Sequence, residues 1–405
     1  MTSNSILINP NEGRMKRSNL KEFQYVKIEN QGRRLFCLQQ NLGVLAWVLF
    51  FKKDTLRPPM RADPRTLSIR RVLSGLLSNY RLIKKNLIFL LVFARQKYSG
   101  QTSEAAVNLP VFGQICVPVH KGYKIFDLRR GVVSKIFDHD VDSSSISGEI
   151  EKLKNVSQLD FAPSLKRWNI GERWYEEDFI SGSSDDCIPR DSLAILKKFY
   201  QDIAPCILER LILFQRPKIN NAIEYINETI EIVAVRRLAK QASSMREFNK
   251  ITSFIDLMVG QLHEEGNCPV FLVFTHGDFV PANMLNTKHG IKMIDWEDAI
   301  YRSTLYDFYS YFFLRIVSWR YPVNQVVSEI NSALSFLVSA LAKKDPNISQ
   351  SLLHFEKIYR WIYYLELVCR LVERETTDKN FDIMDCILRY IDAFNNYEKV
   401  MVWKK

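Results

Sequence analysis

Cysteine is scarce and scattered in this sequence of 405 residues. The seven cysteines are an odd number and form no Cys-x-x-Cys pair, so we expect neither a disulfide framework nor a zinc site. Long apolar runs are lacking too, since the longest, residues 44–51 and 87–94, fall far short of the ~20 residues that cross a bilayer. The first apolar stretch also has no basic flank or small-residue cleavage site, so no signal peptide is expected. These absences predict a soluble, cytoplasmic protein.

Glycine and proline are also sparse, with 15 and 14 residues, while 47% of the chain is hydrophobic and 25% is charged. This composition excludes disordered, collagen-like and low-complexity proteins. The chain is longer than one hydrophobic core usually serves, so two or three domains are expected.

Positive charge is concentrated near the N-terminus. Residues 1–110 contain 19 Lys and Arg against 6 Asp and Glu, whereas the remaining residues contain 37 against 39. The segment 1–108 could therefore recruit an anionic membrane surface or glycan, which would make the protein peripheral at the inner membrane face. The alternative is a solubilising or structural role for the same charges. No specific nucleic acid partner is expected.

Strand patterns gather early in the chain and helical patterns gather late. Alternating apolar residues predict strands near 23–28, 34–38, 45–51, 121–127, 132–137, 164–170 and 173–180. Helical spacing of apolar residues predicts helices over 66–97, 149–155, 219–241 and 248–264, and three long helical patterns within 325–401. Residues 100–108 are interpreted as a linker, and residues 270–295 as a strand–loop–strand unit. The fold class predicted from this order is α+β.

The strand–loop–strand unit contains the most informative residues. An apolar strand, Val270–Phe274, leads to His276-Gly277-Asp278, and Asn283 follows. A second apolar segment ends at Asp295. Phosphoryl transfer needs a carboxylate to accept the proton of the attacking hydroxyl, and oxygen ligands to hold Mg²⁺ on the nucleotide phosphates. Strand ends hold such groups at defined separations, so this order of residues predicts a phosphotransferase site.

These motifs, HGDxxxxN followed by IDWE, resemble the aminoglycoside phosphotransferase and choline kinase superfamily over roughly residues 111–315. The resemblance implies a bilobal protein-kinase-like fold and the use of ATP and Mg²⁺. It implies that Asp278 is the catalytic base, that Asn283 and Asp295 are metal ligands, and that Asp307, after Tyr306, braces the catalytic loop.

The same resemblance implies a lysine on a strand that contacts the nucleotide phosphates, and a glutamate on a helix that orients this lysine. Lys135 lies in the apolar strand Val133–Phe137 and is the candidate lysine. Glu149 is the preferred partner, and Glu151, on another face of the same helix, is the competitor. The backbone around Glu177, Asp178 and Phe179 resembles the hinge that binds adenine. The sequence has no GxGxxG loop to cover the phosphates, and residues 117–122, with one glycine, occupy the expected position of that loop.

The predicted organisation is a small antiparallel-sheet N-lobe over 109–182 and a large, mainly helical C-lobe over 183–405, with a basic N-terminal extension over 1–108. The predicted function is transfer of the ATP γ-phosphoryl group to a hydroxyl of a small molecule such as a sugar, glycan precursor, amino alcohol or aminoglycoside. The competing hypothesis is a non-catalytic kinase-like binding module that its basic segment recruits to an anionic partner.

The acceptor is left open by the sequence. A polycationic acceptor calls for an acidic pocket, but residues 183–405 contain 27 basic and 28 acidic residues. A quaternary ammonium acceptor calls for an aromatic cage. The candidates for a cage are Trp319, Tyr321, Trp361, Tyr363 and Tyr364, although aromatic residues at this spacing also suit a helix-packing core.

Overall fold

The computed structural model describes residues 21–30, 33–38, 104–109, 113, 115–119, 121–182, 191–219, 221–229, 245–265, 268–375 and 383–402. The chain forms two compact units. Unit 1 is Met1–Asp185 with Leu285–Lys292, and unit 2 is Asp186–Met284 with Met293–Lys405.

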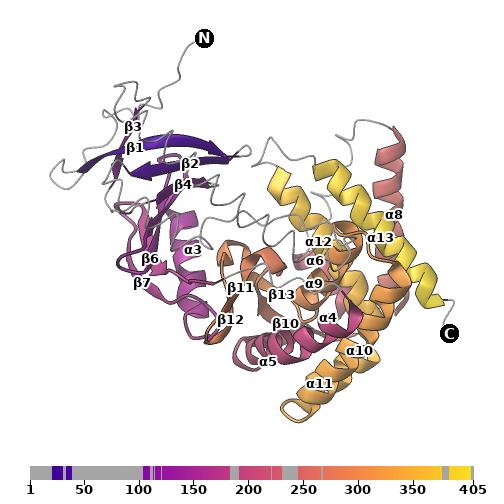
Figure 1. Ribbon diagram of the computed structural model, residues 1–405. Coiled ribbons are helices and arrows are strands. Elements are labelled where there is room, and N and C mark those ends of the chain that lie inside the picture. Colours follow the sequence, from indigo (N-terminus) through magenta and orange to yellow (C-terminus); the bar gives the residue numbers. More distant parts are fainter. Residues whose placement is uncertain are drawn as a thin grey trace, which may run out of the picture. The chain divides into compact units, whose positions relative to one another are not determined.

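Unit 1 is built on an eight-stranded antiparallel sheet in the order β3-β1-β2-β4-β5-β6-β8-β7. Its strands are β1 (Lys21–Asn30), β2 (Arg33–Leu38), β3 (Glu104–Leu109), β4 (Ile115–Val119), β5 (Gly122–Asp127), β6 (Val132–Phe137), β7 (Leu165–Asn169) and β8 (Trp174–Asp178). The strands lie in indigo to magenta in Figure 1. These strands confirm the ones predicted near 23–28, 34–38, 121–127, 132–137, 164–170 and 173–180. The strand predicted at 45–51 and the helix predicted at 66–97 lie outside the described residues.

One local prediction is wrong. Residues 100–108 do not form a linker throughout, because Glu104–Leu109 is strand β3 and pairs antiparallel with β1. Its partner lies far upstream in the chain, so the pairing has no signal in the local sequence pattern. Strands β1, β2 and β3 of the basic segment therefore belong to the same sheet as β4 to β8.

Helix α3 (Ser143–Val156) is the helix of unit 1 that follows β6. Asp142 caps it, with its side chain accepting a hydrogen bond from the backbone N–H of Ser145 at 2.8 Å, which satisfies one of the donors left free at a helix start. The buried face includes Ile146, Ile150 and Leu153. Glu149 shares that buried face, and a buried carboxylate on an apolar face requires a partner.

Unit 2 is mainly helical. Its helices are α4 (Ser192–Lys198), α5 (Ala204–Leu213), α6 (Ala222–Thr229), α8 (Met245–Glu265), α9 (Tyr306–Val317), α10 (Val323–Ala342), α11 (Pro346–His354), α12 (Glu356–Glu375) and α13 (Ile383–Val402). A π-helical turn, Phe199–Ile203, joins α4 to α5. The three long helices predicted within 325–401 are confirmed as α10, α12 and α13, and the nine-residue α11 is an addition.

The strands of unit 2 differ in part from the prediction. Strand β10 (Val270–Thr275) is confirmed, but it is the centre of an antiparallel sheet with β9 (Gln215–Ile219) and β13 (Ile300–Ser303). The helix predicted over 219–241 is confirmed in part as α6, Ala222–Thr229, and residues 230–241 lie outside the described residues. β9 overlaps that prediction at Ile219 only. It contains Pro217 and is only five residues long, so its pattern is too short to identify without β10 beside it. A separate two-stranded sheet, formed by β11 (Met284–Thr287) and β12 (Gly290–Met293), lies almost wholly in the segment Leu285–Lys292 of unit 1.

The core of unit 2 is strongly aromatic. Phe313 on α9 lies within 5.7 Å, centroid to centroid, of Tyr363 and of Phe394 on α13, and Tyr364 stacks on Phe394 at 3.9 Å. By length and composition, α10 is apolar enough to cross a membrane. Its apolar residues Val326, Ile330 and Leu337 are nevertheless fully buried in unit 2, so packing within the protein accounts for their composition. The order of strands first and helices later is that of the α+β class that the sequence predicts.

Candidate active site

The loop that contains the predicted base, Asp278, starts where β10 ends. Thr275 closes that strand and donates from Oγ1 to the carbonyl oxygen of Ile300 on β13, at 2.9 Å. His276 and Gly277 follow and are buried. Asp278 comes next, and a quarter of its side chain is exposed. A largely buried strand is therefore followed by a partly exposed carboxylate.

Gly277 cannot be replaced without disturbing this loop. Its φ is +82°, and a Cβ there would lie 2.3 Å from the carbonyl oxygen of Asp298 and 2.8 Å from Nη1 of Arg302. Both the backbone conformation and the space available therefore require glycine.

We expect Gly277→Ala to lower the free energy of unfolding by at least ~2 kcal/mol, through backbone strain and the clash with Asp298. Gly260→Ala on α8 is the matched control, because no described atom lies within 4 Å of a Cβ placed there and alanine favours a helix interior. Denaturant unfolding of the two variants is the measurement. Equal stability of both would show that the loop tolerates a side chain at 277.

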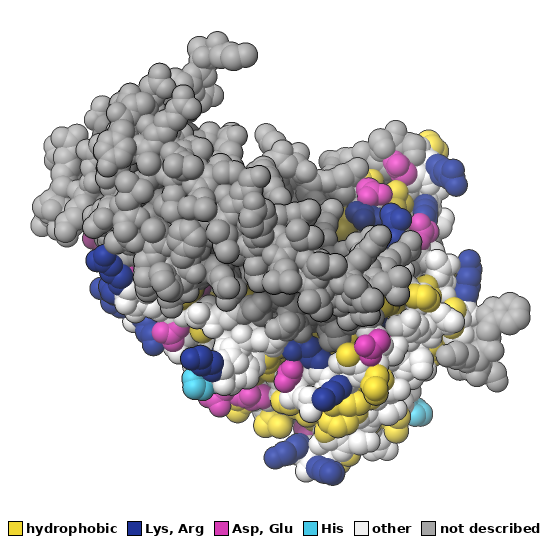
Figure 2. Space-filling model, in the orientation of Figure 1, with side chains coloured by type: hydrophobic (Ala, Val, Ile, Leu, Met, Phe, Trp, Pro, Cys, Tyr) yellow, Lys and Arg dark blue, Asp and Glu magenta, His cyan; other side chains and the backbone are white. Residues whose placement is uncertain are grey.

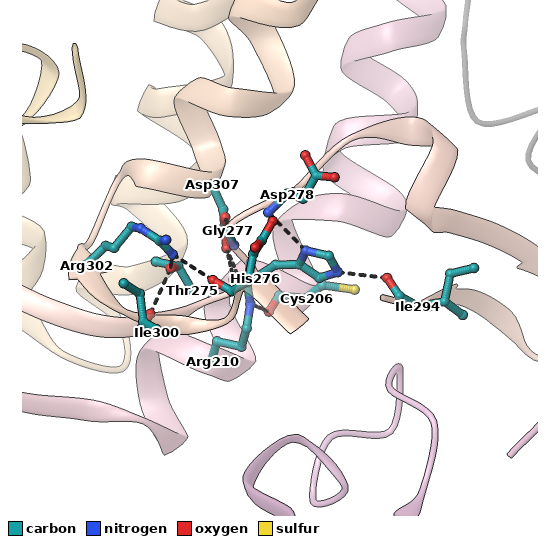
Figure 3. Close-up of polar contacts among 11 residues, drawn as sticks. Cys206, Arg210, Thr275, His276, Gly277, Asp278, Ile294, Ile300, Arg302 and Asp307 are labelled. Atoms are coloured by element: carbon teal, nitrogen blue, oxygen red, sulfur yellow. Dashed lines mark hydrogen bonds and ion pairs between the residues drawn. The ribbon is translucent and has the colours of Figure 1, made fainter. Parts of the chain in front are cut away.

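Asp307, at the start of α9, holds the loop through its carboxylate (Figure 3). Its Oδ2 accepts a hydrogen bond from the backbone N–H of His276 at 2.7 Å, and its Oδ1 accepts one from the N–H of Gly277 at 3.1 Å. Arg210 on α5 forms a buried ion pair with the same carboxylate. The bracing role predicted for Asp307 is therefore observed, and the charge of Asp307 is compensated within the interior, as a buried carboxylate requires.

His276 is entirely buried, and its ring joins the two loops of the site. Its Nδ1 accepts from the backbone N–H of Asp278 at 3.2 Å, which assigns the ring proton to Nε2, and Nε2 lies 3.0 Å from the carbonyl oxygen of Ile294. Desolvation lowers the pKa of His276 below its usual value, even though Asp307 and Asp278 act in the opposite direction. A neutral ring at neutral pH is the form that makes both hydrogen bonds.

Asn283 and Asp295, the predicted metal ligands, are tied to each other through the backbone. The N–H of Ile294 donates to the carbonyl oxygen of Asn283 at 2.9 Å. The Asn283 side chain donates from Nδ2 to the backbone oxygen of Asp278 at 3.0 Å and to its Oδ2 at 3.1 Å. These bonds orient the amide so that its oxygen is the end left for a cation.

Asp295 adopts an uncommon backbone conformation, with φ 70° and ψ 59°. Residues other than glycine rarely occupy this left-handed region, and strain of this kind clusters at functional sites. No group of three or more His, Cys, Asp or Glu side chains that could hold a metal occurs in the described part of the chain. The two oxygen ligands still suit Mg²⁺, because this ion takes one or two protein ligands and completes its shell with phosphate oxygens and water.

In unit 1, Lys135 and Glu149 form a buried ion pair. Lys135 Nζ donates to both carboxylate oxygens of Glu149, at 2.7 and 3.0 Å. Tyr175 on β8 donates from its hydroxyl to Oε1 of the same carboxylate at 2.8 Å. Glu151, the competing candidate, is exposed and pairs instead with Lys154. The structure thus brings together Lys135 and the preferred glutamate, while their roles toward a nucleotide remain predictions.

The predicted hinge, Glu177–Phe179, ends strand β8. The N–H of Asp178 donates to the carbonyl oxygen of Ser164 at 3.0 Å, and the N–H of Phe179 donates to that of Gly131 at 2.9 Å. The Glu177 side chain is buried. Two backbone donors of this segment are therefore engaged within unit 1, and adenine binding by the segment remains a prediction.

The turn that replaces a glycine-rich loop joins β4 to β5. Gly122 has φ +147°, and a Cβ there would lie 1.9 Å from the carbonyl oxygen of Ile136 on β6. Close packing of the sheet thus explains this glycine, and Lys121 before it is exposed.

The aromatic residues considered for a cation cage divide into two groups. Trp361, Tyr363 and Tyr364 on α12 are each at most 2% exposed and belong to the core of unit 2. Tyr321 is partly buried, with the Arg315 guanidinium 4.2 Å from its ring centroid. The helix-packing interpretation therefore holds for the three residues of α12.

Three further residues were not identified from the sequence: Tyr175, Arg210 and Arg370. Arg370 on α12 contacts Asp278 itself, with its Nη2 3.0 Å from Oδ1 of that carboxylate. Burial alone would lower the pKa of Arg370, but Tyr306, Asp278 and Asp298 raise it well above its usual value. Arg210 and Arg370 lie in no motif, and Tyr175 lies in the hinge-like segment 174–182 without a signal of its contact with Glu149.

Comparison with known proteins supports the class that the motifs predict. Residues 242–327, which include His276, Asp278, Asn283 and Asp295, match the model of the phosphotransferase enzyme family. The resemblance to the aminoglycoside phosphotransferase and choline kinase superfamily stated from the sequence is thereby confirmed as a resemblance to a phosphotransferase family. Among curated protein sequences, none matches this chain significantly.

Several solved structures are similar to this chain at low identity. Choline kinase LicA from Streptococcus pneumoniae is 16% identical, with 68% of this chain and 90% of that one covered and a TM-score of 0.42. An aminoglycoside phosphotransferase from Streptomyces rimosus, in complex with ADP and streptomycin, is 15% identical, with 63% and 92% covered and a TM-score of 0.42. A glucosamine kinase in complex with glucosamine, ADP and inorganic phosphate is 12% identical, with 70% and 80% covered and a TM-score of 0.45.

Proposed function

We propose that this protein transfers the γ-phosphoryl group of ATP to a hydroxyl of a small molecule, with Mg²⁺ as the metal. The observation that supports this most is the placement of Asp278. Its loop is held by Asp307 through two backbone N–H groups, while its carboxylate stays a quarter exposed. A reactive carboxylate on a rigid support is what a base needs in a reaction accelerated mainly by positioning.

Each residue then has a defined task. Asp278 orients the acceptor hydroxyl and takes its proton as the bond to phosphorus forms. Asn283 and Asp295 hold Mg²⁺, which when bound neutralises charge on the phosphates. Lys135 pairs with Glu149, which also accepts a hydrogen bond from Tyr175; this lysine binds the phosphates of the nucleotide, and the backbone of Glu177–Phe179 binds adenine.

The acceptor is proposed as a class rather than as one molecule: a sugar, glycan precursor, amino alcohol or aminoglycoside. Basic and acidic residues are nearly equal in number over 183–405, and Figure 2 shows side chains of both signs interspersed on the described surface in that view. This balance favours no strongly charged acceptor. Choline, glucosamine and streptomycin, which the names of the similar structures include, are the natural first compounds of a panel.

The test is an acceptor screen that follows ADP release from ATP with Mg²⁺, run in parallel on the wild type and on Asp278→Asn. We expect at least one acceptor to raise ADP release in the wild type only, with the phosphorylated product found by mass spectrometry. Nucleotide binding without turnover for any acceptor would instead favour the non-catalytic binding module.

We further propose a cytoplasmic location and, for residues 1–108, association with an anionic membrane surface or glycan. For the location, the support is the scattered distribution of the seven cysteines, which form no Cys-x-x-Cys pair and so suit a reducing compartment. For the basic segment, the support is its charge alone, 19 basic against 6 acidic residues over 1–110.

A further inference from the structure

Arg370 on α12 joins two loops of the site through one guanidinium nitrogen. Its Nη2 lies 3.0 Å from Oδ1 of Asp278 and 2.9 Å from Oδ2 of Asp298. The Arg370 side chain is only 8% exposed, so these contacts are poorly screened by water. We call this arrangement the Arg370 bridge.

The two carboxylates, Asp278 and Asp298, belong to two loop segments whose separation must stay fixed for phosphoryl transfer. Asp278 is the proposed base. Asp298 ends the short 3₁₀ helix Trp296–Asp298, which begins directly after the proposed metal ligand Asp295. The Arg370 bridge therefore links the segment of the base to the segment of the metal ligand.

The bridge also fixes how the base is presented. Oδ1 of Asp278 contacts Arg370, and Oδ2 accepts from Asn283 Nδ2 at 3.1 Å. A carboxylate with a donor on each oxygen has its plane set from two sides. A displacement of ~1 Å of such a group can cost about 10²-fold in rate.

A purely structural ion pair is the simpler reading, and the same helix offers a comparison. Arg360, also on α12 and also buried, pairs with Glu356 and with Glu398. Neither carboxylate belongs to the candidate site. Buried ion pairs are weak evidence for stability in general, so the choice of carboxylates is what distinguishes Arg370 from Arg360.

We propose that Arg370 is a positioning residue that sets the orientation of Asp278 and its separation from the segment of Asp295, so that helix α12 is part of the catalytic apparatus. This inference rests on the proposed function.

The first test compares Arg370→Met and Arg370→Lys with Arg360→Met. We expect Arg370→Met to lower kcat at least 100-fold while the KM for ATP changes less than threefold, because the base is displaced but the nucleotide ligands remain. Arg370→Lys retains the charge on a shorter side chain and should recover part of the loss. Arg360→Met should lower the unfolding midpoint with kcat within threefold of the wild type, measured below that midpoint. A kcat within threefold of the wild type in both Arg370 variants would overturn the proposal.

A second test asks whether Arg370 acts through Asp278. In an Asp278→Asn background, Arg370→Met should cost little further kcat, whereas independent roles would multiply the two losses and contradict the proposal.

If no acceptor is found and the proposed function fails, the bridge remains testable by unfolding. Arg370→Met, Asp298→Asn and their double variant form a cycle. Non-additive shifts of the denaturation midpoint would support the bridge, and additive shifts would overturn it.

Discussion

Replacing Asp278 with asparagine should lower kcat by about 10²- to 10⁴-fold, the range associated with loss of a general base. The affinity for Mg·ATP should change little, because the carboxylate acts on the acceptor hydroxyl. Asparagine keeps the size of the side chain but offers one acceptor oxygen where Asp278 uses two, toward Arg370 and Asn283. A modest loss of stability is therefore expected alongside, and the unfolding midpoint should be measured with the kinetics.

Asp278→Glu is the matched variant for this experiment. It retains the charge but moves the carboxylate outward by one methylene, so a loss of about 10²-fold is expected from displacement alone. Near-normal turnover in Asp278→Asn would remove this residue from the role of base. Near-normal turnover in Asp278→Glu alone would show that position matters less than charge.

Asp295→Asn should weaken Mg·ATP binding at least tenfold and leave metal-free ATP binding unchanged. A neutral amide is a poor ligand for a hard cation, and asparagine tolerates the left-handed conformation that Asp295 adopts at φ 70°. The backbone should therefore be undisturbed, so that the effect reports on the metal. Calorimetric titration with ATP, in the presence and absence of Mg²⁺, is the measurement.

Asp256→Asn, at an exposed position on α8, is the control for this titration. It removes the same charge from the same unit at a position outside the candidate site, so its Mg·ATP affinity should equal that of the wild type. Wild-type affinity in Asp295→Asn would exclude Asp295 as a metal ligand.

The elements of the fold were predictable where a local pattern was long enough to be unambiguous. The hairpin of β5 and β6, helix α3 and the three long C-terminal helices show clear periodicity, and the structure has them. Strands β3, β9 and β13 are four to six residues long. Each is stabilised by a partner distant in the sequence, so a reading of its own residues cannot identify it.

The sequence by itself determined which residues are available for chemistry. Phosphoryl transfer requires a carboxylate base and oxygen ligands, and the motif residues Asp278, Asn283 and Asp295 provide them. The tertiary structure decided how these residues are held. Arg370 and Arg210 reach the site from helices outside the motif region and pair with carboxylates that are distant in sequence. Such contacts depend on how helices pack, and an arginine destined for a buried ion pair looks in sequence like one that faces water.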